Sequence, residues 1–279
     1  MIDVTWQTVA SGIVSPEGPA VDRDGNIFLV SRWTGKVVQV TAAGEVHELV
    51  DTGGKPQSIA LVPSGELLLA DAKNHSLQRI TRQGELSTIA NTVDGDPPEE
   101  FLGPNDLVIG DDKVVYLTDP GLDMESPGQI LRIELDSGAV TRLVHGVAFP
   151  NGITISGDGR WLYVAESVTC RVLRLELFDG GRRLGPVEVF IELDGHLPDG
   201  IAFDAEGRLL IACCGAGVLD VVSPDGQLVA SIPAGGPGCT NCVFGGDDFQ
   251  TLYMTEDEQQ ALLKTRWPVP GQRAYSRSL

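Results

Sequence analysis

Basic residues and long apolar runs are both scarce in this chain. Its 279 residues include 20 lysines and arginines against 39 aspartates and glutamates, which gives a formal net charge of −19. A surface of this sign repels nucleic acid and anionic membranes and favours cation binding. No apolar run approaches the roughly 20 residues that a membrane helix needs. We therefore expect neither a nucleic acid nor a membrane as a partner.

Secretion signals and paired cysteines are missing as well. Residues 1–6 lack the basic and apolar segments of a signal peptide, so we expect a cytoplasmic protein. Five cysteines, an odd number, argue against a disulfide framework. Cys239 and Cys242, with Cys213 and Cys214, suggest a zinc site, but adjacent strand residues point to opposite faces and cannot both join one tetrahedral site. Small buried cysteines are the better interpretation.

The chain has instead a repeat that occurs six times. Each repeat opens on a polar residue, continues into a short apolar stretch, turns at a Gly- or Asp-rich segment and enters a second apolar stretch. Such turns join antiparallel strands. The opening residues lie 40 to 48 positions apart: Glu17, Gln57, Asn105, Asn151, Asp199 and Asn241.

Three or four strands in each repeat, without a convincing helix, predict an all-β, six-bladed β-propeller. We expect one domain over residues 1–279, with a short irregular tail at about 268–279. Val4–Val9 alternates like a strand, and we predict that it joins the last blade and closes the ring. A two-sheet sandwich is the alternative, but it does not require the same opening chemistry six times.

Ring closure would bring the six opening residues to one level around a common axis. Glu17, Asn151 and Asp199 supply two carboxylates and an amide, and Asn105 is a direct or water-mediated fourth ligand. Calcium takes six to eight oxygen ligands of this kind. The alternative, that each residue caps a turn, leaves carboxylates repelling one another at the channel mouth. The pattern therefore favours a hard divalent cation at the axis.

A second set of residues ends the second strand of each repeat, on the same face but farther from the axis. We expect this set to form an electronegative mouth, although solvated strand ends are an alternative interpretation. The set consists of Ser31, Asp71, Asp119, Glu166, Cys213 and Glu256.

Several ordered segments also match a known family. They are Ser15-Pro16-Glu17-Gly18-Pro19, Gly103-Pro104-Asn105-Asp106-Leu107, Tyr116-Leu117-Thr118-Asp119-Pro120, Phe149-Pro150-Asn151-Gly152-Ile153, Leu162-Tyr163-Val164-Ala165-Glu166 and Pro198-Asp199-Gly200-Ile201-Ala202. Together they resemble the SMP-30/gluconolactonase/luciferin-regenerating-enzyme family over nearly the whole chain.

This resemblance implies a six-bladed propeller that binds a divalent metal in its channel and hydrolyses lactones. It assigns the metal to Glu17, Asn151 and Asp199, and a contact with substrate or metal to Asn105. The sequence departs from the sugar lactonases related to the animal proteins, which have Arg at the position of Gly103 and Gly at that of Leu107. Gluconolactone itself is therefore not implied.

We accordingly predict a metal-dependent lactonase that acts on a small lactone, with Asp199 and Asn105 as catalytic residues. Ca²⁺ is the expected ion, and Zn²⁺, Mn²⁺ and Mg²⁺ are alternatives that similar ligands accept. Asp119 or Glu166 are alternatives to Asp199 as the general base. Asn105, Asp119, Trp33 and His196 are the expected substrate contacts.

The chain lacks a Gly-x-Ser-x-Gly elbow, so a serine nucleophile has no support. Hydrolysis of organophosphates on the same metal, or calcium binding without catalysis, are the competing hypotheses. The sequence leaves the oligomeric state open.

Overall fold

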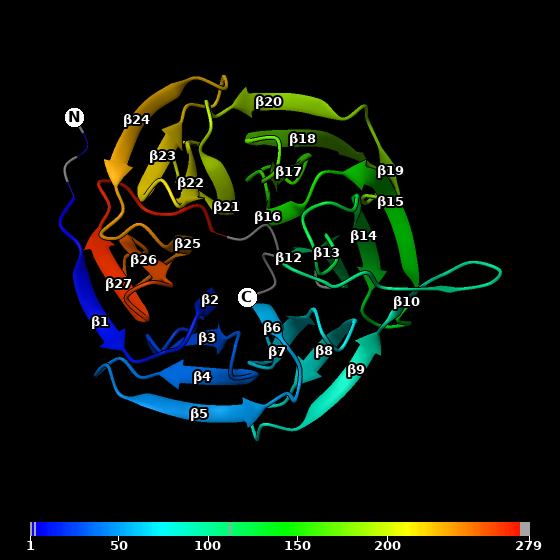
Figure 1. Ribbon diagram of the computed structural model, residues 1–279, viewed down its shortest axis with the longest axis horizontal. Coiled ribbons are helices and arrows are strands. Elements are labelled where there is room, and N and C mark those ends of the chain that lie inside the picture. Colours follow the sequence, from blue (N-terminus) through cyan, green and yellow to red (C-terminus); the bar gives the residue numbers. More distant parts are fainter. Residues whose placement is uncertain (1, 3, 112, 274–279) are drawn as a thin grey trace.

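Six antiparallel β-sheets surround a central axis (Figure 1). The computed structural model describes residues 2, 4–111 and 113–273. In this part of the chain every regular element is a strand, and nothing helical is long or apolar enough to cross a membrane. The prediction of an all-β, six-bladed propeller is therefore confirmed.

Each blade runs outward from an inner strand beside the axis, and consecutive strands pair antiparallel. Blade 1 contains β2 (Pro16–Val21), β3 (Ile27–Ser31), β4 (Lys36–Val40) and β5 (Val46–Asp51). Blade 2 contains β6 (Pro56–Leu61), β7 (Leu67–Asp71), β8 (Ser76–Ile80) and β9 (Leu86–Ala90). Blade 3 contains β12 (Leu107–Asp111), β13 (Val114–Asp119), β14 (Gly128–Glu134) and β15 (Val140–Val147).

The second half of the ring repeats this order. Blade 4 contains β16 (Pro150–Ile155), β17 (Trp161–Glu166), β18 (Arg171–Phe178) and β20 (Glu188–Glu192), with the short β19 (Arg183–Leu184) also paired to β18. Blade 5 contains β21 (Leu197–Phe203), β22 (Leu209–Cys214), β23 (Val218–Val222) and β24 (Leu228–Pro233). Blade 6 contains β25 (Cys239–Gly245), β26 (Thr251–Glu256) and β27 (Ala261–Arg266).

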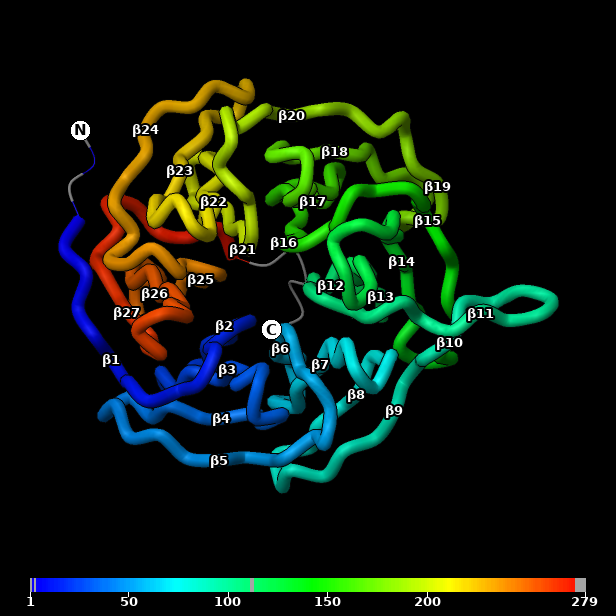
Figure 2. The backbone as a smooth tube through the Cα atoms, in the orientation of Figure 1, coloured from blue at the N-terminus to red at the C-terminus, as the bar shows by residue number. Residues whose placement is uncertain are grey.

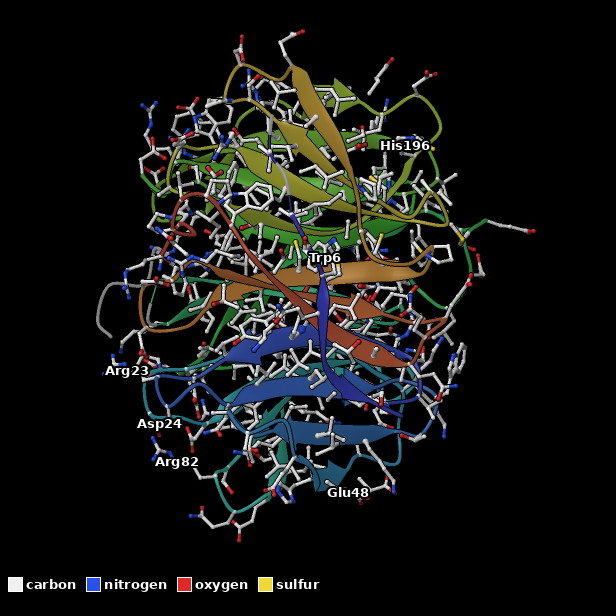
Figure 3. The ribbon with its side chains drawn as sticks, turned by 90° about the vertical axis from the view of Figure 1, so that its left-hand side faces the viewer. Trp6, Arg23, Asp24, Glu48, Arg82 and His196 are labelled. Carbon is white, nitrogen blue, oxygen red and sulfur yellow. The ribbon has the colours of Figure 1, made fainter. Side chains whose placement is uncertain are left out.

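The N-terminal strand closes the ring, as predicted. β1 (Gln7–Ser11) pairs antiparallel with β27, so that Gln7 lies opposite Lys264 and Ser11 opposite Ala261. The strand begins and ends later than the alternation at residues 4–9 suggested. Trp6, just before it, donates its indole N–H to the Pro233 carbonyl at 2.8 Å (Figure 3). The chain start is therefore fastened to both blade 5 and blade 6.

A small hairpin outside the ring was not predicted. It consists of β10 (Thr92–Val93) and β11 (Glu99–Glu100), and it projects from the rim between blades 2 and 3 (Figure 2). Its sequence is mostly polar and lacks the apolar alternation that indicates a strand.

The apolar core lies between the blades. Alternating side chains of neighbouring sheets form six buried clusters, so each blade buries both of its faces. Between blades 4 and 5, the Tyr163 ring meets Phe190 and Phe203 edge-on, each at a centroid distance of 5.0 Å. This packing makes the ring rigid and fixes the positions of the inner strands.

The segment after β27 is irregular, as expected, but it is not free. Trp267 is fully buried and donates its indole N–H to Asp204 at 3.1 Å. The Ala205 amide then bonds to the Pro270 carbonyl at 2.8 Å, and the Gln272 amide to that of Phe203 at 2.9 Å. Residues 268–273 therefore dock beside the far ends of the inner strands, while residues 274–279 of the predicted tail lie outside the described residues.

Candidate metal centre and substrate cavity

A cavity of about 260 Å³ opens at the axis, and five of the six predicted ring residues line it. These are Glu17, Gln57, Asn105, Asn151 and Asp199. Asn241 is not among the lining residues. Its side-chain oxygen instead accepts the Cys242 backbone N–H at 2.8 Å. The predicted metal residues Glu17, Asn151 and Asp199 are thus brought together, with Asn105 beside them.

A local irregularity of the inner strands aims these side chains at the axis. The ladder between the first and second strand of a blade changes register at the ring residue, which is how a β-bulge redirects a side chain. In the three blades that carry the predicted ligands, this shift falls between Glu17 and Ala20, between Pro150 and Ile153, and between Pro198 and Ile201.

The glycines that follow two of the ligands let neighbouring blades meet backbone to backbone. A Cβ added to Gly152 would lie 2.2 Å from the Asp199 carbonyl oxygen, and one added to Gly200 would lie 2.2 Å from Cγ of Asn241. No real contact is this short, so a side chain at either position would push the blades apart. Glycine at these positions sets the spacing between ligands on different blades.

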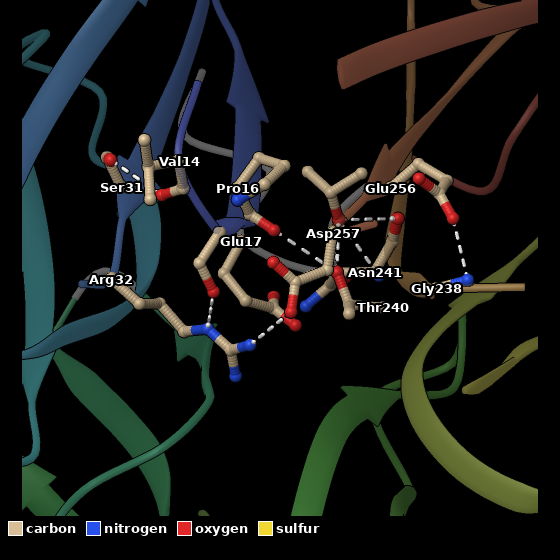
Figure 4. Close-up of polar contacts among 12 residues, drawn as sticks. Val14, Pro16, Glu17, Ser31, Arg32, Gly238, Thr240, Asn241, Glu256 and Asp257 are labelled. Atoms are coloured by element: carbon tan, nitrogen blue, oxygen red, sulfur yellow. Dashed lines mark hydrogen bonds and ion pairs between the residues drawn. The ribbon is translucent and has the colours of Figure 1, made fainter. Parts of the chain in front are cut away.

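The two ring carboxylates are electrostatically unfavourable without a cation. Glu17 is 5% exposed and Asp199 is half-buried. Burial raises the pKa of both carboxyls, and the charge of Glu17 raises the pKa of Asp199 further. Arg32 lowers both pKa values, but its guanidinium is already paired with Asp257 at 3.1 Å (Figure 4). The negative charge of the two carboxylates is therefore not fully compensated by Arg32, and a further positive charge beside them would be stabilised.

The donor chemistry of this ring fits a hard divalent ion. Two carboxylates and the amides of Asn151 and Asn105 provide oxygen ligands, which calcium and similar ions prefer. Cys214 also lines the cavity, but burial raises the pKa of its thiol to about 12, so it stays protonated and is a poor ligand. The residues present would hold an oxygen-preferring cation rather than a thiophilic one.

A buried acid that sequence reasoning overlooked supports the ring. One oxygen of Asp106 accepts from Ser58 Oγ at 2.5 Å and from the Leu107 amide at 2.9 Å, and the other accepts from the Ile153 amide at 3.0 Å. These bonds connect the inner strands of blades 2, 3 and 4 just behind the ring. The only signal in the sequence was its place next to Asn105.

The second set of residues, which ends the second strand of each blade, has a different role from the expected electronegative mouth. Asp119 is fully buried and accepts from the backbone amides of Leu102 and Gly103 at 2.9 and 2.7 Å, and from Gln129 at 2.6 Å. It does not line the cavity, so the structure does not support it as a substrate contact. Instead it holds the loop that leads to Asn105.

Equivalent residues in other blades hold the equivalent loop. Asp71 accepts the Lys55 amide at 2.8 Å, and Glu256 accepts the Gly238 amide at 2.6 Å (Figure 4). Glu166 accepts the Ala148 amide at 2.9 Å and also binds Thr169 and Arg171. Although burial raises the pKa of Glu166, these bonds hold it below its usual value, which disfavours Glu166 as a general base.

Trp33 and His196 also lie away from the cavity lining. The Trp33 side chain is 65% exposed, and its ring packs under the Lys55 ammonium, 4.4 Å from Nζ to the centroid. His196 pairs through Nδ1 with Asp220 at 2.7 Å, within blade 5 (Figure 3). Of the four expected contacts, only Asn105 is among the residues that line the cavity, and a substrate contact by Trp33 or His196 stays a prediction.

One of the five cysteines, Cys213, lies in the same cluster as His196 and Asp220. Cys213 Sγ lies 3.4 Å from the same oxygen of Asp220, and the ligand atoms of His196, Cys213 and Asp220 all lie within 4.8 Å of one another. Ser231 Oγ donates to the other oxygen of Asp220 at 2.5 Å. These hydrogen bonds already account for the buried carboxylate. As expected from strand alternation, Cys213 and Cys214 point to different sites, and all five cysteines are free.

Comparison with known proteins agrees with this fold. Residues 15–257 match the family model described as SMP-30/Gluconolactonase/LRE-like region. The chain belongs to this family. A gluconolactonase from Zymomonas mobilis is 26% identical over 314 residues, which cover 93% of this chain and 81% of that protein. A solved structure described as the calcium-binding protein regucalcin, from Agrobacterium tumefaciens, has a TM-score of 0.82 and 20% identity, covering 98% and 96% of the two chains.

Not every relative shares the name lactonase. The Arabidopsis thaliana protein strictosidine synthase-like 13 is 32% identical over 166 residues, which are 54% of this chain and 40% of that protein. This chain therefore spans less than half of that relative. Family membership and fold follow from these matches, and the chemistry has to be argued from the cavity.

Gly103 stands where the sugar lactonases related to the animal proteins have arginine, and the backbone gives a structural reason for this difference. Gly103 has a φ of +146°, a conformation that is essentially restricted to glycine. A Cβ there would come within 3.0 Å of the Gly121 carbonyl carbon. The arginine expected at this position in the sugar lactonases cannot be placed on this backbone, and the basic side chains of the cavity come instead from Arg32 and Lys55.

Proposed function

We propose that this protein hydrolyses a small lactone with the help of one divalent metal ion, with Ca²⁺ as the expected ion, held by Glu17, Asn151 and Asp199. The observation that carries the proposal is a pair of carboxylates, buried Glu17 and half-buried Asp199, that face an open cavity with two amides beside them. The resemblance to a gluconolactonase supports the reaction, and the resemblance to a calcium-binding regucalcin supports the ion.

When bound, the ion supplies a Lewis acid that polarises the lactone carbonyl. The protein side chains supply the rest. Asn105 lines the cavity, and within the described residues its side chain has no hydrogen-bond partner, so its amide is free to donate to the substrate. Its backbone is fixed by the bond from its N–H to the Thr118 carbonyl at 2.9 Å. A fixed donor of this kind stabilises the charge that develops on oxygen when water attacks.

Asp199 is the proposed general base. It takes a proton from the attacking water, the bond between the carbonyl carbon and the ring oxygen breaks, and the released alkoxide regains a proton to give the hydroxy acid. Burial and the charge of Glu17 raise the pKa of Asp199 in the protein without the ion. A bound cation would lower this pKa, so the base role rests on the place of Asp199 in the cavity lining beside Asn105. Asp119 and Glu166 are too fully hydrogen-bonded to compete for this role.

A panel of neutral lactones, read by proton release in weak buffer, tests the proposal. We expect turnover that is lost on chelation and restored by Ca²⁺, Mg²⁺, Mn²⁺ or Zn²⁺. Asp199→Asn should remove turnover while the protein keeps its fold, and Glu85→Gln, an exposed change, should leave it intact. No turnover with any of these ions would refute lactone hydrolysis. Tight calcium binding without turnover would favour a non-catalytic propeller, and turnover of a fluorophosphate alone would favour an organophosphate hydrolase.

A further inference from the structure

The wall of the cavity formed by blades 1 and 2 carries two basic side chains. Arg32 follows β3, Lys55 precedes β6, and both line the cavity. The whole chain has only 20 basic residues against 39 acidic ones. Two cations therefore line one small cavity beside the two carboxylates of Glu17 and Asp199, a larger share of basic residues than in the chain as a whole.

These two cations differ in how they are neutralised. Arg32 donates to Asp257 at 3.1 Å and to Ser15 Oγ at 2.9 Å (Figure 4). Lys55 has no ion-pair partner among residues 2, 4–111 and 113–273. Its backbone is held by the bond from its N–H to Asp71 at 2.8 Å, and its ammonium rests against the Trp33 ring at 4.4 Å. Lys55 is thus a positioned but unpaired cation.

The surroundings of Lys55 favour an incoming anion. Burial lowers the pKa of Lys55, and the neighbouring charge of Arg32 lowers it further, because both disfavour the ammonium form. In the described part of the chain neither Glu17 nor Asp199 forms an ion pair with Lys55, and in the proposed function both would face the metal ion. With a divalent ion balancing those two and Asp257 balancing Arg32, one positive charge remains on Lys55.

Blades 3, 4 and 5 contribute apolar side chains to the cavity. They are Leu122, Met124, Phe149 and Leu197, of which Leu122 and Met124 are 59% and 49% exposed. A ligand that fills the cavity therefore meets apolar side chains from these blades and a cation from blade 2. This asymmetry orients a substrate that is charged at one end only.

Resting on the lactonase function proposed above, we infer that the substrate is a lactone with a second, anionic group, a carboxylate, sulfonate or phosphate, which Lys55 binds at the blade 2 wall. A lysine ammonium binds such groups as a point charge. Trp33, which is not among the cavity-lining residues, acts as a positioning residue because the Lys55 ammonium packs against its ring.

Paired lactones test this inference. Glucono-1,5-lactone is compared with its 6-phosphate and with a lactone of the same ring size that bears a carboxylate, using proton release corrected for spontaneous hydrolysis. The wild type should turn over at least one anionic lactone with a higher kcat/KM than the neutral one. Lys55→Gln should lower kcat/KM for that lactone about 10-fold or more, as expected when a charge-assisted hydrogen bond is lost, with less than about a 2-fold change for the neutral one.

Lys73→Gln is the matched control. It removes the same charge from the same blade, but Lys73 is exposed, and its ammonium donates to the Gly53 carbonyl at 3.1 Å. It should leave the ratio of the two kcat/KM values unchanged. A neutral lactone that is always preferred, or an equal loss for both lactones in Lys55→Gln, would overturn the inference and leave the lactonase function standing. Absence of turnover for every lactone would instead refute the function itself.

Discussion

Replacing Glu17 by Gln should make the metal-free protein more stable, although it removes a proposed ligand. Burial raises the pKa of Glu17 from 4.5 to about 7. One pKa unit corresponds to about 1.4 kcal/mol, so the ionised carboxylate costs the folded state about 3 kcal/mol. The side chain is 5% exposed, so solvent screens this cost little. Glutamine has nearly the same shape and no charge, and it escapes the cost.

The sign of the pH dependence follows from the raised pKa. The folded-state pKa lies above that of the unfolded chain, so the cost is fully present above about pH 7 and disappears as the pH falls toward 4.5. The metal-free wild type should therefore gain stability from this group on acidification from pH 8 to pH 5. Glu17→Gln should lack this gain, and the two proteins should differ most at pH 8.

Thermal or urea unfolding in chelator, at a series of pH values, measures the effect. A domain of 150–250 residues changes its Tm by about 2–4 °C per kcal/mol, so the variant should melt roughly 6–12 °C higher at pH 8. Glu85→Gln, on the surface of blade 2, serves as the control and should not change Tm. With saturating Ca²⁺ the order should reverse, because only the wild type gains binding energy. A variant less stable than the metal-free wild type at pH 8 would refute this account of the ring.

Two further substitutions test the packing around the site. Gly152→Ala should lower the free energy of unfolding by about 1–3 kcal/mol and should also reduce metal affinity, because the new Cβ meets the Asp199 carbonyl. Denaturant unfolding measures the first effect and calcium titration the second. Unchanged calcium affinity would contradict the role of glycine in spacing the ligands. Asp119→Asn should cost about 1.5–3 kcal/mol of unfolding free energy, because its bonds to Leu102 and Gly103 weaken. A large loss of kcat without loss of stability would instead make Asp119 catalytic.

The fold could be predicted because its repeat is local. Each strand and turn of the six repeats has its own apolar stretch and its own Gly- or Asp-rich turn, and ring closure follows from their number. The hairpin of β10 and β11 was missed because two-residue strands have no periodicity to detect. The docking of Trp267 and residues 268–273 was missed because it depends on contacts with Asp204 and Phe203, which are distant in sequence.

The site was predictable only at the repeat positions. Glu17, Asn151 and Asp199 were predicted to lie at the axis because each opens a repeat, and all three line the cavity. The residues that end the second strands were assigned to the channel mouth because the sequence shows on which face of the propeller they lie. It does not show which groups they bind. Asp119 faces the amides of its own loop, and no pattern in the sequence reveals that direction. Lys55 was overlooked because its function depends on an orientation that only the structure gives.

The position of the ring's seam has a consequence for how the molecule holds together. Blade 6, built from both ends of the chain, stands between blade 1, which carries Glu17, and blade 5, which carries Asp199. An ion that binds both carboxylates would therefore bridge blades 1 and 5, on either side of the blade in which the first and last strands of the described ring pair by hydrogen bonds. Opening that pair of strands and releasing the ion then become one equilibrium, and we expect amide hydrogen exchange in β1 to slow when Ca²⁺ binds.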